Sequence, residues 1–188
     1  MITKKGHRII PFANEYEKYL SDELKILGVH YNSQLNWTSH TTKICKNARR
    51  HFYILRQLKF SLEKRDLITI YKSVILSALE YCCPLYIGLD AHNAKTIESI
   101  RKQCHRIICG KDCECEQFEE ISKRRRRQAL LFFEGMKSKS NLLHNVFPQT
   151  HAASGKLVMP YCRTERRLSS FIPQCIILSN TSHKKSDI

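Results

Sequence analysis

The clearest hydrophobic pattern in the chain runs from Ser61 to Tyr81. Apolar residues recur there every three or four positions, which places their side chains on one wide stripe of a helix. Ser61 is positioned to cap the helix, and Pro84 ends it because an interior proline loses a hydrogen bond and clashes with the preceding turn. A stripe of this length predicts packing neighbours on both sides. Its members, three or four residues apart, are Leu67, Ile70, Tyr71, Val74, Ile75, Ala78 and Leu79.

A second helix is predicted from about Trp37 to Lys59. At 100° per residue its apolar side collects Ile44, Ala48, His51, Phe52, Leu55 and Leu58. The other side collects Lys43, Lys46, Arg49, Arg50, Tyr53 and Arg56. No acidic residue occurs between Glu23 and Glu63, whereas an ordinary solvated helix face mixes both charges. This cationic face is suited to following a phosphate backbone, with Tyr53 as a sugar or base contact; a merely soluble face is the alternative.

A third helix is predicted between Asp90 and Gly110. Asp90 is a plausible N-cap, and Gly110 fits the left-handed position that closes helices. The apolar side holds Ile97, Ile100, Cys104, Ile107 and Ile108. The outer side carries Lys95, Arg101, Lys102 and Arg106, opposed only by Glu98.

A fourth helix is expected over residues 116–136. It contains five consecutive cations, from Lys123 to Arg127, which cover every face of a helix. The apolar stripe from Phe118 to Phe132 passes through Arg125. We therefore expect Arg125 to lay its stem on the core and to lead its guanidinium out to solvent or to an acid. The run itself is compatible with phosphate binding, a nuclear-import signal or a solvated helix face.

The two ends of the chain are expected to be less regular. Residues 24–31 suit a strand, which needs a partner because its backbone groups must be paired; residues 7–12 could supply one. A helical turn is predicted near 141–147, and the tail is expected to be disordered from about Thr181. The predicted divisions are a polar segment (1–23), a helical block (24–110), a basic helical extension (111–147) and an extended arm with its tail (148–188).

Charge is the most informative feature of the composition. The 188 residues include 32 Lys and Arg against 17 Asp and Glu, a formal net charge of +15. This imbalance favours a polyanionic partner, most commonly nucleic acid, although basic chains also arise by drift in fragments under no selection. Nine cysteines and an N-terminus without an apolar run favour an intracellular, reducing compartment, nuclear or cytoplasmic. The longest apolar stretch is interrupted by Glu80 and Pro84, so no membrane span is expected.

The order of several motifs resembles one protein family, the jockey-type non-LTR (LINE-like) retrotransposon reverse transcriptases. The resemblance implies the thumb and post-thumb part of an RNA-directed DNA polymerase, which grips the template–primer backbone. The palm and fingers would be missing neighbours. The motifs are Ile26-Leu-Gly-Val29, Leu35-Asn-Trp37 with His40, Tyr71-Lys-Ser-Val-Ile75, Leu79-Glu-Tyr81 and Arg106-Ile-Ile-Cys-Gly110, followed more weakly by Leu142-Leu-His144, Ser170-Phe-Ile-Pro173 and Asn180.

No catalytic residue, metal site or small-molecule substrate is expected. Polymerisation requires carboxylates that bind two Mg²⁺ ions, and the resembling family keeps two such aspartates together in its palm. This sequence has no Asp-Asp pair, and Asp66 and Asp90 are better explained as helix-start residues. Zinc binding is disfavoured because the spacing does not match paired Cys-x₂₋₄-Cys knuckles. The cysteines weighed for zinc are Cys104, Cys109, Cys113 and Cys115, with His105; Cys82 and Cys83 are expected to fill the core, and His40 to be structural.

The predicted fold is mainly α: a small three- to four-helix bundle with one vestigial N-terminal strand or hairpin and an irregular C-terminal arm. Weak, salt-sensitive binding of a nucleic-acid duplex is expected. If about six cations contact phosphates, log affinity should fall with log salt concentration at a slope near −5. The alternatives are a truncated product without function, a domesticated protein-interaction module, or one piece of a polymerase encoded upstream. The candidate contacts are Lys43, Lys46, Arg49, Arg50, Tyr53, Arg56, Arg101, Lys102, Arg106, Lys123, Arg124, Arg126 and Arg127.

Overall fold

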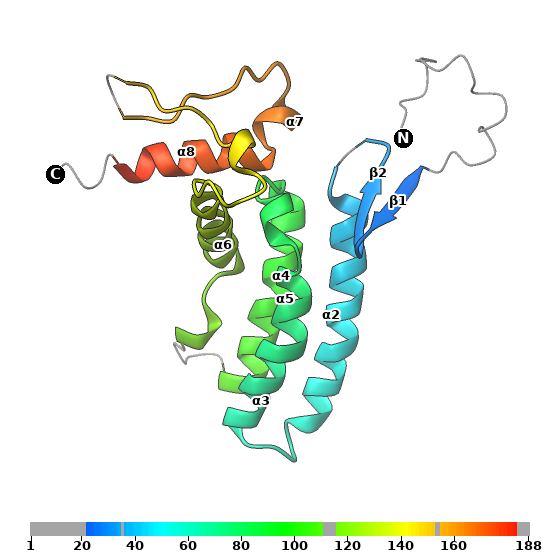
Figure 1. The fold of residues 1–188 in the computed structure, drawn as a ribbon. Coiled ribbons are helices and arrows are strands. Elements are labelled where there is room, and N and C mark those ends of the chain that lie inside the picture. The colour runs from blue at the N-terminus through cyan, green and yellow to red at the C-terminus, as the bar shows by residue number, and fades with distance from the viewer. Residues whose placement is uncertain (1–21, 35, 111–115, 153–154, 184–188) are drawn as a thin grey trace.

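A computed structural model describes residues 22–34, 36–110, 116–152 and 155–183 of the chain. The fold is mainly helical with one N-terminal hairpin, which confirms the predicted fold class. Three long antiparallel helical segments lie side by side, and α6 and α8 are added at one end of them (Figure 1). The possible strand at 7–12, the connector at 111–115 and the end of the tail lie outside the described residues.

The N-terminal segment that was predicted as one strand forms a two-stranded hairpin. β1 (Glu23–Ile26) pairs antiparallel with β2 (Val29–Asn32). Leu27 and Gly28 between them both have positive φ, as a tight two-residue turn between twisted strands requires. The single strand expected in this segment is therefore broken at the turn, and β2 supplies the partner that β1 needs. The Tyr81 hydroxyl donates to the Leu27 carbonyl at 2.7 Å, which holds the turn against the end of the central helix.

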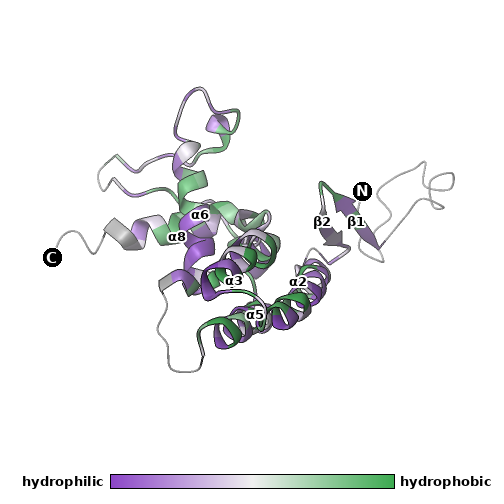
Figure 2. Ribbon diagram, turned by 90° about the horizontal axis from the view of Figure 1, so that it is seen from below, coloured by the Kyte–Doolittle hydropathy of each residue, from purple (hydrophilic) through white to green (hydrophobic). Residues whose placement is uncertain are grey.

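The helix α2 (Thr38–Leu58) starts and ends within one residue of its predicted bounds. Cys45, Ala48 and Leu55 are fully enclosed in the main core, which α2 shares with the central helix and α5 (Ala91–Cys109). The predicted apolar side is confirmed, and hydrophilic residues follow the outer side of the helix (Figure 2).

His40 lies in an aromatic cluster at the start of α2. Its side chain is buried, with ring centroids 6.3 Å from Trp37 and 5.4 Å from Tyr86. Its Nδ1 accepts a long 3.5 Å hydrogen bond from the His30 backbone, and its buried Nε2 has no partner within the described ranges. This placement agrees with the structural role expected for His40.

We expect the folded chain to lose stability as the pH falls below about 6.5, the ordinary histidine value. Burial lowers the pKa of His40, and partial burial together with Lys43 lowers the pKa of His30. The unfolded chain binds these protons more readily than the folded chain. The contribution of the two neutral histidines to the free energy of unfolding is therefore complete above pH 6.5, and it is lost as the pH falls through their folded-state pKa values. Urea midpoints at pH 7.5 and pH 5.0 measure the effect, which should shrink in an H30Q/H40F variant. Equal midpoints for the natural chain would contradict it.

The central helix is continuous from Lys64 to Glu80 but contains a wide turn. α3 (Lys64–Ile70) runs into the π-helical η2 (Tyr71–Leu76) and then into α4 (Ser77–Glu80). The prediction of one helix ending before Pro84 is confirmed. The Ser61 cap is wrong, because Glu63 occupies the N-cap position and its side chain makes no capping bond.

The π turn moves the buried stripe of the central helix. Val74 was expected inside but is 36% exposed, whereas Leu76 is 5% exposed. A π turn contains an additional residue, so later side chains are rotated relative to a regular helix. On the exposed side the hydroxyls of Thr69, Ser73 and Ser77 donate to the carbonyls four residues earlier, a contact that competes with the helical ladder.

The segment after the central helix is compact. Cys82 has a positive φ of 54° and leaves the helix, and η3 (Cys83–Tyr86) contains Pro84. Cys83 is buried as expected, but Cys82 is only partly buried and is not a core residue. α5 follows with both predicted ends confirmed: the Asp90 carboxylate accepts from the Asn93 N–H at 2.9 Å, and Gly110 has a positive φ of 88°.

The helix α6 (Ile121–Gly135) is shorter than expected, because η4 (Glu116–Phe118) is a separate 3-10 turn. Arg125 is only 5% exposed, so the prediction that its stem enters the core is confirmed. Of the two predicted exits for its guanidinium, the one to an acid is wrong; the group lines an open cavity between α5 and α6, and Nε is the nitrogen that is buried without a partner among the described residues. Across these residues Arg125 makes no ion pair.

The C-terminal arm is the largest departure from expectation. α7 (Glu165–Leu168) and α8 (Phe171–His183) form in a segment that was predicted to be irregular. α8 packs on α6 in a second core, to which it contributes Cys175 and Ile176. The period was obscured because this helix is apolar on most sides. Pro173 also argued against it, but lies in the first turn, where the missing N–H costs no helical bond.

The segment between α6 and α7 is held by a short helical turn, a β-bridge and side-chain hydrogen bonds. η5 (His144–Val146) confirms the predicted helical turn. Further along, Thr150 pairs with Leu157, and the Asn180 side chain bonds both the N–H and the carbonyl of Leu157 at 3.1 Å. The arm is therefore fixed to α8 by this amide side chain and by the packing of Phe147 and Leu157 against the second core.

Candidate nucleic-acid interface

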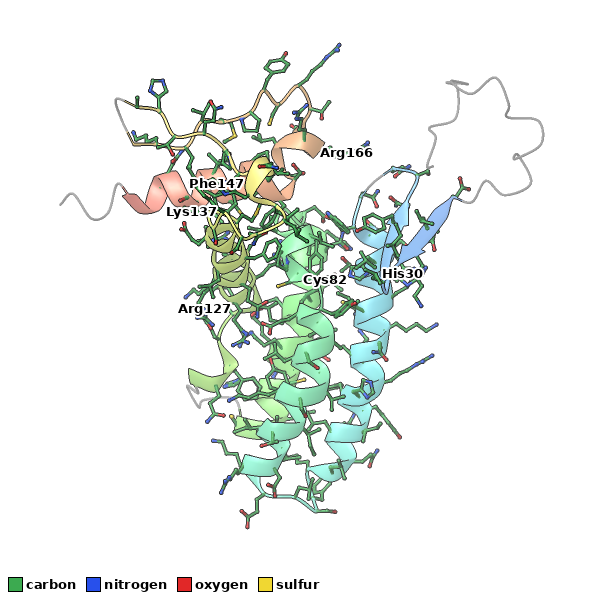
Figure 3. The ribbon with its side chains drawn as sticks, viewed as in Figure 1. His30, Cys82, Arg127, Lys137, Phe147 and Arg166 are labelled. Carbon is green, nitrogen blue, oxygen red and sulfur yellow. The ribbon has the colours of Figure 1, made fainter. Side chains whose placement is uncertain are left out.

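Four cations stand on the outer side of α2. Lys46, Arg49, Arg50 and Arg56 are exposed, and none forms an ion pair with any residue that the structure describes. At 100° per residue they and Tyr53 occupy an arc of about 120°. Nitrogen-tipped side chains project from this free edge of the helix (Figure 3). The predicted cationic face therefore exists as a continuous surface.

The length of this surface suits a nucleic-acid strand. Lys46 and Arg56 are ten residues apart, which is about 15 Å along a helix. A duplex carries one phosphate per strand about every 3.4 Å of its axis, so the face spans about four phosphates. Tyr53 is 62% exposed in the middle of the surface, where its ring is available for a sugar or a base.

Lys43 differs from the other cations of α2. Its Nζ lies 2.5 Å from Glu23 Oε2 and 3.0 Å from His30 Nδ1, and Ser39 donates to the same carboxylate. The hydrogen bond from Lys43 is the largest cause of the lowered pKa of Glu23. His30 lies where the hairpin meets α2 (Figure 3). Lys43 thus connects the hairpin to the helix, and the free cations begin at Lys46.

The candidate cations of α5 have two different environments. Arg101 is half-buried: its Nε lies 2.5 Å from Glu98 Oε1, and its Nη1 donates to the Phe118 carbonyl at 2.7 Å. It therefore connects α5 to the turn before α6. Lys102 and Arg106 are exposed and form no ion pair within the described ranges.

The basic run of α6 is divided in the same way. Arg124 makes a two-pronged contact with Glu80, which raises its pKa, and Arg127 bonds Glu119 at 3.0 and 2.8 Å. Lys123 and Arg126 are exposed, with no ion pair to a described residue. The five cations are therefore not one phosphate-binding surface.

A further group of cations was missed in the sequence. Arg163, Arg166 and Arg167 are exposed around α7, with Glu165 among them. Arg166 projects from α7 on the side of the hairpin (Figure 3). Three arginines within five residues were a visible signal, but the segment was interpreted as an irregular arm.

The described residues contain no group of three or more His, Cys, Asp or Glu side chains that could hold a metal ion. Cys104 is buried, which raises the pKa of its thiol to about 12, and Cys109 is partly buried. Cys113 and Cys115 lie outside the described residues. Asp66 and Asp90 occupy helix starts, as predicted. None of the described helices combines the length and apolar character needed to cross a membrane.

Comparison with known proteins gives one partial similarity. The chain is 31% identical over 100 residues to a protein described as a probable RNA-directed DNA polymerase from transposon X-element, of Drosophila melanogaster. The match covers 50% of this chain and 10% of that protein, so the chain corresponds to a small part of its relative. No family model matches the chain. No solved structure matches it either.

Proposed function

We propose that this chain corresponds to the thumb and post-thumb part of a retrotransposon RNA-directed DNA polymerase and contacts the backbone of the template–primer duplex. The partial similarity to a transposon polymerase supports the family. The supporting observation for the contact is the outer face of α2, where four unpaired cations surround an exposed tyrosine. The chain alone is proposed to bind weakly and to incorporate no nucleotide.

The cations divide into two roles in this proposal. Lys46, Arg49, Arg50 and Arg56 hold phosphates, because no described acid competes for them. The exposed cations Lys102, Arg106, Lys123 and Arg126 are secondary contacts at most. Lys43, Arg101, Arg124 and Arg127 act within the fold, because each is held by a carboxylate.

A protein-binding role is the second candidate, and the hairpin favours it. All four residues of β1 are exposed, and its apolar side chains Leu24 and Ile26 are 41% and 49% exposed. Leu27 at the turn is 84% exposed. An exposed apolar strand at the edge of a sheet is a site for a further strand. In a longer polymerase this partner would be the palm, and in a domesticated protein it would be another chain.

Binding to a duplex should be strongly salt-dependent. Four phosphate contacts predict that log affinity falls with log salt concentration at a slope of about −3.6, and secondary contacts make it steeper. This slope is less negative than the slope near −5 expected from six contacts, because fewer cations are free. Fluorescence anisotropy with a labelled RNA–DNA duplex between 25 and 200 mM salt measures it. Affinity that does not change with salt, or no binding at 25 mM salt, would refute the proposed contact.

A further inference from the structure

A cavity of about 400 Å³ lies between α5 and the start of α6. This volume is at the lower end of the range for small-ligand sites. The walls combine apolar side chains from both helices with three cations and two hydroxyl groups. Two carboxylates complete the polar lining, which consists of Lys95, Glu98, Ser99, Lys102, Glu120, Ser122 and Arg125.

Arg125 is the unusual member of this lining. Its side chain is 5% exposed, its buried Nε has no hydrogen-bond partner, and it forms no ion pair with any described residue. Buried charges in proteins are normally paired, and a guanidinium remains protonated in a protein. Its neighbours Arg124 and Arg127 both have carboxylate partners. Lys123 and Arg126 are also without an ion pair but are exposed to water, so Arg125 is the buried cation of this run that lacks an anionic partner among the described residues.

The acids near the cavity do not supply this partner. Glu98 Oε1 is bonded to Arg101, and its Oε2 accepts the Ile121 N–H at 3.2 Å. Glu120 is exposed, accepts from the Ser122 hydroxyl and forms no ion pair with Arg125. Lys95 and Lys102 at the opening are exposed and also without an ion pair to any described residue.

We propose that this cavity binds a phosphate group, with Arg125 as its buried donor and Lys95 and Lys102 at its opening. A guanidinium fork matches two phosphate oxygens, and the two lysine ammonium groups can donate to the others. The N-terminus of the fifteen-residue α6 adds a positive dipole end. Three cations suit a doubly charged phosphate better than a single carboxylate. This site is separate from the cationic face of α2 and does not depend on the proposed function.

The test is unfolding of the full chain in inorganic phosphate, with ionic strength held constant by chloride. The natural chain should gain stability saturably: at ten times the dissociation constant, its unfolding equilibrium constant should fall about elevenfold. Arg125→Met should fold without phosphate, because an apolar side chain of similar length removes an unpaired buried charge, and should show no phosphate dependence. Lys102→Gln, at an exposed position, should weaken the dependence. Lys139→Met removes one exposed charge outside the cavity and should behave as the natural chain.

The source of the phosphate is distinguished with single-stranded dodecanucleotides that carry either a 5′-phosphate or a 5′-hydroxyl. Stronger stabilisation by the phosphorylated strand would identify a strand end as the ligand. Equal effects of the two strands would exclude the strand end, so that the stabilisation by inorganic phosphate is binding of the free anion. An equal effect of chloride and phosphate, or an undiminished phosphate effect in Arg125→Met, would overturn the site. Such a failure would leave duplex binding by α2 untouched, because that is measured by its own salt slope.

Discussion

Replacement of Gly88 by alanine is expected to detach the α7–α8 segment from the helical body. A Cβ atom at Gly88 would lie 2.0 Å from the Ser169 carbonyl oxygen and 2.7 Å from its carbonyl carbon. Ser169 joins α7 to α8, and its backbone cannot move without shifting both helices. Overpacking of a tight site costs about 1–3 kcal/mol and occasionally more. The second core includes Ile87, next to Gly88, so displacement of α7 and α8 would also expose this core to solvent.

Limited proteolysis and the free energy of unfolding measure this effect. Gly88→Ala should be cleaved faster within residues 155–170 and should unfold at a lower denaturant concentration. Gly135→Ala is the matched control, because a Cβ there meets no atom within 4 Å. It lies at the end of α6 and should be neutral or slightly stabilising. Equal cleavage and stability of the Gly88→Ala and Gly135→Ala variants would show that the close approach to Ser169 is unimportant.

Neutralisation of the α2 face is expected to cause the largest loss of binding. In the variant K46Q/R49Q/R50Q/R56Q, four proposed phosphate contacts are removed without changing a buried residue. Each contact contributes about 0.9 of a log unit at 0.1 M salt through counterion release, so duplex affinity should fall by on the order of a thousand-fold. Because the natural affinity is already weak, binding of this variant should be undetectable at 0.1 M salt. Fluorescence anisotropy at this salt concentration measures the loss.

A matched variant separates this surface from net charge alone. Lys59, Arg65, Lys72 and Lys139 are exposed, form no ion pair with a described residue and lie outside the proposed contacts. Their replacement by glutamine also removes four charges. This second variant should keep most of the duplex affinity, because distributed charge adds little without direct contact. A similar loss in both variants would show that binding depends on total charge and not on α2.

Helices with a regular apolar period, and in α5 with recognisable capping residues, were predicted correctly from the sequence. α2 and α5 were placed correctly because their apolar residues keep one period throughout and because Asp90 and Gly110 mark the ends of α5. The π turn at Tyr71–Leu76 was not predictable, since no proline or glycine marks it and the period around it looks regular. α8 was missed because a helix that is apolar on most sides shows no stripe.

The candidate site was predicted as a list of cations, without their partners. Arg124 meets Glu80, which is 44 residues away in the sequence, and Lys43 meets Glu23 across the hairpin. Only the folded chain brings these pairs together. Arg101 is different: Glu98, three residues earlier, was a visible local partner. The cations of α2 beyond Lys43 stay free because no acid occurs between Glu23 and Glu63, which the sequence states directly.

The most direct test of duplex binding by α2 is the difference in salt slope between the natural chain and K46Q/R49Q/R50Q/R56Q on the same RNA–DNA duplex. Both are measured at low salt, where the variant still binds. Four lost phosphate contacts predict that the log–log slope becomes less negative by about 3.6. If the two proteins bind with the same slope, the outer face of α2 does not hold the backbone.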